Sequence, residues 1–190
     1  MDSDLADAVS TLRGVLEDRN QDARFAKAPA ELVEDLKKKL RLPARYRAFL
    51  LGANPVRVET VTPVERVRLI PAEELEKAQD LVRSGDWKAS WVLCAESALL
   101  GDPYFLDLSK PDAEGDCAVF TAMSGQDRWV PTLAASSFAQ FLRILTTAME
   151  TAAGFGDAIM DDEDEDAFRQ ALGPKIKVID SAAFRAGHWT

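Results

Sequence analysis

The sequence has few of the residues from which catalytic and metal sites are most often built. It contains one histidine, His188, and two cysteines, Cys94 and Cys117, among 190 residues. Three such residues without a short Cys–Cys spacing do not make a structural zinc pattern. A histidine near a chain end is also a poor platform for a general base. We therefore expect a protein that is not an enzyme and that uses no cofactor or metal.

Two further patterns for ion or phosphate binding are incomplete. Six consecutive acids over residues 161–166 match the first positions of a calcium-binding loop. The later positions do not match, because Asp166 stands where the loop requires glycine and Leu172 where it requires a bidentate glutamate. No glycine-rich phosphate loop is present. We interpret the acidic run as a solvated helix start, with weak binding of a divalent cation as the alternative.

Long hydrophobic runs are also missing. None approaches the roughly 18 residues of a membrane-spanning helix, and residues 1–4 lack the pattern of a signal peptide. We expect a cytoplasmic protein without membrane contact. Both cysteines lie within apolar stretches and are predicted to be buried free thiols.

Positive charge is scarce relative to negative charge. The chain has 23 Lys and Arg residues against 32 Asp and Glu residues, which gives a net charge of -9. Such a balance argues against nucleic acids and anionic lipids, because both are bound through surplus positive charge. Residues 95–127 hold seven acids against Lys110 alone. We expect a basic protein partner to be attracted.

Hydrophobic periodicity predicts the order of secondary structure. Apolar residues at helical spacing indicate a helix over 3–18 with Ser3 as its cap, a second over 29–40 and a short third around 46–50. Alternation and turn residues then indicate strands at 56–61, 67–70, 91–95, 104–108, 117–120 and 129–130, with a helix over 71–84 between the second and the third. Ser136 or Ser137 caps a last, strongly amphipathic helix that reaches residue 149. The pattern predicts an α+β fold with an antiparallel or mixed sheet flanked by helices.

Composition divides the chain into three parts. We assign residues 1–26 to an N-terminal helix and linker, 27–149 to one domain, and 150–190 to an acidic C-terminal extension. Within the extension, Phe168, Ala171 and Leu172 offer a small apolar face, and Ile176 and Val178 predict a short strand. Whether His188 and Trp189 pack on the domain stays open. The last helix of the domain is either all core or partly exposed for a homodimer, and we favour a monomer.

Several short motifs, in order, resemble those of a known family. The first is Leu42-Pro43, Tyr46, Phe49-Leu50 and Gly52-Ala53-Asn54; further along, a strand ends at Glu96, the turn Gly101-Asp102 follows, and the next strand ends at Asp107. Val119-Phe120 and a helix beginning Ser137-Phe138 complete the series. This order is similar to the SUKH superfamily of Smi/Knr-like domains, although Asn54-Pro55 replaces the usual Asn-Gly. The resemblance implies an α+β fold and a non-enzymatic role in binding proteins, often as an immunity protein that neutralises a cognate bacterial toxin. The alternative that it implies is a regulatory scaffold with several partners.

The acidic stretch supplies the candidate binding face for such a toxin. The candidate residues lie in or beside the turns of one half of the predicted sheet: Glu96, Asp102, Tyr104, Asp107, Asp112, Glu114 and Asp116. A basic enzyme would be drawn to this face electrostatically. The competing interpretation is that the aspartates only fix turns and that Tyr104 belongs to the core.

Overall fold

A six-stranded antiparallel sheet forms the centre of the molecule. The computed structural model describes residues 1–19, 22–83, 85–155 and 162–190. Neighbouring strands follow the order β3-β4-β5-β6-β7-β8, and every pair is antiparallel. The strands are β3 (Glu59–Val61), β4 (Arg66–Leu69), β5 (Trp91–Ser97), β6 (Pro103–Asp107), β7 (Val119–Thr121) and β8 (Thr132–Ala135). A separate pair, β1 (Arg24–Ala26) and β2 (Asn54–Val56), lies outside this sheet.

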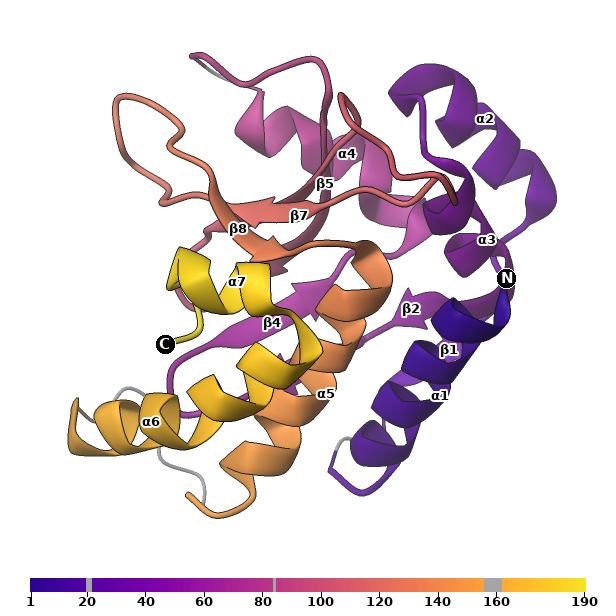
Figure 1. Ribbon diagram of the computed structural model, residues 1–190. Helices are drawn as coiled ribbons and strands as arrows, with labels where there is room; N and C mark the ends of the chain where they lie inside the picture. The colour runs from indigo at the N-terminus through magenta and orange to yellow at the C-terminus, as the bar shows by residue number, and fades with distance from the viewer. Residues whose placement is uncertain (20–21, 84, 156–161) are drawn as a thin grey trace.

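Helices surround the sheet, which confirms the α+β prediction. They are α1 (Ser3–Glu17), α2 (Ala30–Leu40), α3 (Ala44–Ala53), α4 (Ala72–Val82), α5 (Phe138–Ala152), α6 (Asp162–Ile179) and α7 (Ser181–Ala186). In Figure 1, α5 lies in front of the sheet, with α1 along one side of it and α6 and α7 along the other. None of the helices within the described residues is long and apolar enough to cross a membrane.

One core joins the three parts of the chain. Leu5 and Leu12 of α1, Phe141 of α5, and Phe168 and Trp189 near the end are buried in the same hydrophobic cluster. Every apolar residue from Phe138 to Ala152 of α5 is buried, so its amphipathic stripe is all core. Cys94 and Cys117 are buried free thiols, as predicted.

The sheet has a second face with an aromatic cluster of its own. Successive strand residues point to opposite faces, so Tyr104 packs on Phe141 while Phe105 packs on Trp87 and Trp91. Trp87 also contacts Trp129, and both are only partly buried. This face is therefore covered by loop aromatics.

Five local predictions were wrong. The strand expected over 56–61 is divided between β2, which ends at Val56 and pairs with β1, and β3, which begins at Glu59 in the central sheet. Asp2, not Ser3, caps α1, because its carboxylate accepts a hydrogen bond from the Leu5 N–H. The third helix continues through Gly52 to Ala53. Residues 129–130 form no strand, since the Trp129 N–H donates to Asp86, and β8 begins at Thr132.

The fifth error concerns residues 176–178, which belong to α6 and not to a strand. Ile176 extends the four-residue spacing of Phe168 and Leu172, and all three are buried on one side of the helix. Asp161, the first residue of the acidic run, lies outside the described residues, and Asp162 begins α6.

A side chain of α4 completes the sheet where β4 ends. β4 pairs only with residues 95–97 of β5, so Leu93 has no strand partner on that side. The amide of buried Gln79 takes this place: its oxygen accepts from the Leu93 N–H at 2.9 Å, and its nitrogen donates to the Leu93 carbonyl at 3.1 Å. Gln79 thus fixes α4 against β5.

We predict that Gln79→Leu lowers the free energy of unfolding by about 2–4 kcal/mol, because both buried backbone groups of Leu93 lose their partner. Urea denaturation measures the change. The neighbouring exposed Asp80 provides the control, and Asp80→Asn should stay within about 0.5 kcal/mol of the wild type. Equal stability of the two variants would contradict the role of Gln79.

Candidate functional site

β6 separates the predicted acidic residues into two groups. Asp102 lies just before this strand and Asp107 is its last residue, so about 17 Å of extended chain lies between them. Glu96 pairs in register with Pro103 and lies at the Asp102 end. Asp112, Glu114 and Asp116 belong to the connection that follows Asp107. The predicted residues therefore occupy both ends of the sheet and form no single patch.

Two of the seven residues lie in the interior. Tyr104 is 0% exposed and Asp116 is 1% exposed, so neither presents a surface to a partner. Asp112 and Glu114 are exposed, while Glu96, Asp102 and Asp107 are partly buried.

Most of the aspartates hold turns, in agreement with the competing interpretation. Asp112 accepts the N–H groups of Glu114 and Asp116, and Asp107 accepts the N–H of Ser109. Glu96 instead forms an ion pair with Arg68 on the facing strand at 2.9 Å.

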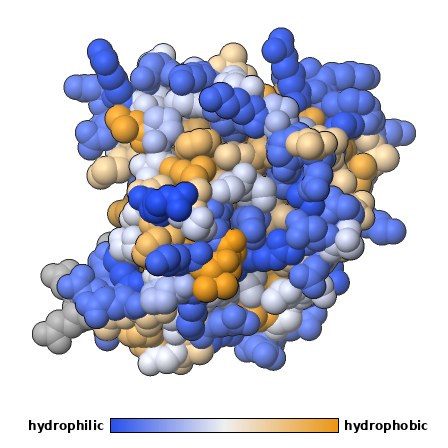
Figure 2. Space-filling view, in the orientation of Figure 1, coloured by the Kyte–Doolittle hydropathy of each residue, from blue (hydrophilic) through white to orange (hydrophobic). Residues whose placement is uncertain are grey.

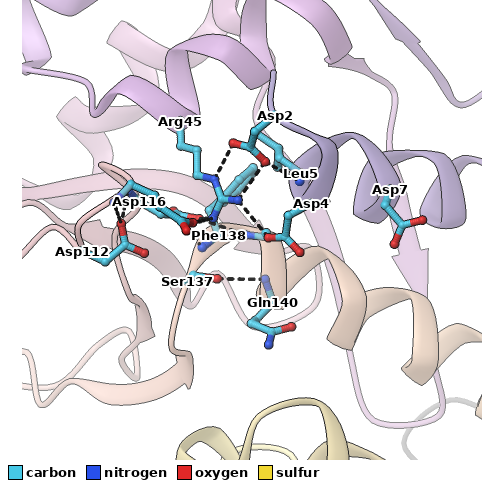
Figure 3. A network of polar contacts seen from close by, with 12 residues as sticks. Asp2, Asp4, Leu5, Asp7, Arg45, Asp112, Asp116, Ser137, Phe138 and Gln140 are labelled. Atoms are coloured by element: carbon cyan, nitrogen blue, oxygen red, sulfur yellow. Dashed lines mark hydrogen bonds and ion pairs between the residues drawn. The ribbon is translucent and has the colours of Figure 1, made fainter.

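A polar network anchors the Asp107 end of the sheet (Figure 3). The buried guanidinium of Arg45 on α3 contacts Asp2 and Asp4 of the α1 region and Asp116. Asp116 in turn accepts hydrogen bonds from the N–H groups of Phe138 and Ala139. These are the first two residues of α5, whose unpaired N–H groups favour a negative charge.

Pairing lowers the pKa values of some carboxyl groups in this network, and burial raises the pKa of another. Hydrogen bonds from Arg45 hold the pKa of Asp2 well below its usual range, and Arg143 lowers the pKa of Asp4. Desolvation raises the pKa of Asp116 despite its hydrogen bonds. The network therefore has a structural role. In its buried ion pair, each of Arg45 and Asp116 compensates the charge of the other.

A second polar chain lies inside the Asp102 end. The Tyr104 hydroxyl lies 2.9 Å from His188 Nε2 and 3.3 Å from Glu65 Oε2. The Ser97 hydroxyl donates to the other Glu65 oxygen at 2.7 Å. Burial raises the pKa of Glu65 and lowers that of His188 to about 4. Sequence reasoning missed Glu65, which gives no local signal in its turn, and left the position of His188 open.

A hollow of about 860 Å³ opens above this chain. Its walls come from the start of β6, the loop of residues 122–131 between β7 and β8, α6 and the final residues. The lining residues are Asp102, Thr121, Ala122, Met123, Gln126, Asp127, Arg128, Val130, Thr132, Arg169, Ala186, Gly187, His188 and Thr190. In Figure 2 the outline of the molecule is indented at the left, below the region of the β7–β8 loop.

Exposed apolar side chains line this hollow and lie on the turn that is hydrogen-bonded to its wall. Leu99 and Leu100 lie on the β5–β6 turn, and Met123 and Val130, 66% and 70% exposed, lie on the β7–β8 loop. The two segments are tied together, because Asp102 accepts the Ser124 N–H at 2.7 Å and the Ser124 hydroxyl donates to the Leu100 carbonyl. A group of exposed apolar residues on a fixed surface is typical of an interaction site. We call these two segments, together with the hollow, the sheet-end surface.

We predict that Asp116→Asn destabilises the protein by about 3 kcal/mol, since Arg45 then loses its buried counterion. Chemical denaturation tests this. Glu114 contacts the same guanidinium at 3.3 Å but is 70% exposed, so Glu114→Gln is the matched control and should change stability by less than about 0.5 kcal/mol. Similar losses of stability in both variants would contradict the burial of Asp116 as the cause of the destabilisation.

His188 makes stability depend on pH. Because its pKa is lowered from the ordinary 6.5 to about 4, the unfolded chain binds a proton more readily than the folded protein. The stabilisation that comes from burying the neutral ring is fully present above pH 6.5, and it is lost as the pH falls toward 4. Between pH 7 and pH 5, the wild type should lose up to about 2 kcal/mol more than His188→Gln, measured by urea unfolding at each pH. Parallel pH profiles would contradict this.

Comparison with known proteins supports one family. The model of the SMI1 / KNR4 family (SUKH-1) matches residues 27–144, more than half of the chain. A search among curated proteins gave no match. The matched range holds the whole sheet, Arg45 and Asp116, whereas α1, α6 and α7 lie outside it. The chain therefore belongs to the SMI1 / KNR4 family (SUKH-1).

Proposed function

We propose that this protein is an immunity protein that binds and neutralises a cognate bacterial toxin without catalysis of its own. Membership of a family of protein-interaction and immunity-type domains supports a protein partner. The observation that carries the proposal is the sheet-end surface, where exposed Met123 and Val130 line a hollow together with Asp102 and Asp127. Exposed Leu99 and Leu100 lie on the turn that is hydrogen-bonded to its wall. Apolar anchors beside charged groups are the usual composition of a specific protein interface.

The two cysteines are buried in the fold and the histidine is partly buried, which supports a binding role. Burial raises the pKa of Cys117 to about 12 and that of Cys94 further still, so both thiols stay protonated and poorly nucleophilic at neutral pH. The His188 ring contacts the Tyr104 hydroxyl and packs against Trp189. These groups stabilise the fold.

Charge indicates the kind of toxin. A net charge of -9 accelerates association with a basic protein and disfavours acidic ones. Because α5 is buried along its whole apolar stripe, we propose that the protein acts as a monomer in a one-to-one complex in the cytoplasm.

The proposal is tested by affinity capture of the tagged protein from its source cells, followed by assay of each stoichiometric partner. We expect one basic protein that stops growth when produced alone and is harmless when produced with this chain. Recovery of several harmless partners would contradict the proposal and favour the regulatory scaffold.

A further inference from the structure

We infer that the hollow of the sheet-end surface receives an arginine side chain from an exposed loop of the toxin, with Asp102 and Asp127 as its carboxylate partners. The inference rests on the proposed function and specifies the chemistry of the partner. It is carried by the shape of the hollow, the free acceptors in its lining and the apolar residues at its rim.

Hydrogen bonds hold the segments that form the walls of the hollow. Asp102 and Ser124 join the β5–β6 turn to the β7–β8 loop through the hydrogen bonds described above. At the other end of that loop, Asp86 accepts the Trp129 N–H at 3.0 Å. The opposite wall is held by Arg169, which donates to the His188 carbonyl, and by Trp189, which donates to the Ala134 carbonyl. A partner therefore binds without first ordering these segments, which lowers the entropic cost of binding.

The lining of the hollow has more unpaired carboxylate oxygens than unpaired cationic side chains. Asp102 uses only Oδ1 for the Ser124 N–H, and Asp127 has no hydrogen bond or ion pair with the described residues. Arg169 already has a carboxylate partner in Glu165 at 2.9 Å. His188 is uncharged at neutral pH, because burial and the nearby Arg169 charge lower its pKa to about 4. Arg128 is the remaining charged residue of the lining, and it opposes a cation. The second oxygen of Asp102 and the carboxylate of Asp127, against one unpaired guanidinium, leave the lining with spare acceptors for a cation.

Arginine fits this lining better than lysine does. Its planar guanidinium donates several hydrogen bonds in a fixed geometry and suits two carboxylates. Its aliphatic stem can pack on apolar surface while the charged end remains polar. Met123 and Val130 offer such a surface in the same lining as the carboxylates. The volume of about 860 Å³ is sufficient for the side chain and adjoining backbone of a loop.

The site also explains how one member of the family could recognise its own partner. Arg169, Gly187, His188 and Thr190 line the hollow, yet they lie beyond the family match, which ends at residue 144. The shared sheet supplies one wall and the C-terminal residues supply the other. Selectivity for one toxin therefore depends on the part of the chain that is outside the common domain.

The inference is tested first with a small probe and the intact protein. ¹⁵N-labelled protein is titrated with Nα-acetylarginine N-methylamide and, as the matched neutral probe, with the citrulline analogue, while amide shifts are followed by NMR. We expect the arginine probe alone to shift amides near Ser124 and Val130. Asp102→Asn, which keeps an oxygen for the Ser124 N–H, and Asp127→Asn should each weaken binding at least threefold. Arg128→Gln should strengthen it, and Asp80→Asn on α4 should change nothing.

Equal binding of the two probes, or shifts confined to the 108–116 connection, would overturn the inference. With the toxin in hand, the Asp102→Asn/Asp127→Asn double variant should associate at least tenfold more weakly, and normal neutralisation by this variant would also overturn it. Absence of any toxin would overturn the proposed function instead. The probe titration still decides the arginine site in that case, so the two failures are distinguishable.

Discussion

The buried guanidinium of Arg45 is the interaction on which the arrangement of the helices depends. It is held by Asp116 inside the protein and by Asp2 and Asp4 at its edge, and Asp116 also binds the first N–H groups of α5. One cation thus connects α1, α3, the connection after β6 and α5. Removing one partner of such a pair leaves an uncompensated buried charge, which is much more costly than never having buried the pair.

The two ends of the sheet consequently have different roles. At the Asp107 end, the acidic residues of the turns and of the Arg45 network are used to hold the chain. At the Asp102 end, a buried polar chain lies beneath a hollow that Asp102, Asp127 and exposed apolar residues line. The proposed recognition uses the exposed residues at the Asp102 end and leaves the buried polar groups of both ends in place, so changes at the binding surface need not unfold the protein.

Much of the fold could be predicted from sequence because its signals are local. Helical stripes and strand alternation identified every helix up to α5, and the serine cap of α5 was correctly restricted to two neighbours, of which Ser137 binds the Gln140 N–H. The errors occurred where a local signal competed with a contact from elsewhere. Ile176 and Val178 have strand-forming side chains, but the buried stripe of Phe168, Leu172 and Ile176 makes them helical. Trp129 is bound to Asp86 and cannot join a strand ladder.

The sequence by itself determined the acidic character, the α+β class and the family of this protein, because composition, periodicity and motif order are properties of neighbouring residues. Only the tertiary structure decided which side chains meet. Asp102 and Asp107 are close in sequence but lie at opposite ends of a strand, because an extended chain advances about 3.3 Å per residue. Glu65 and His188 are far apart in sequence but both contact Tyr104. Such contacts follow from how the sheet and the C-terminal helices pack into one core, which no local pattern records.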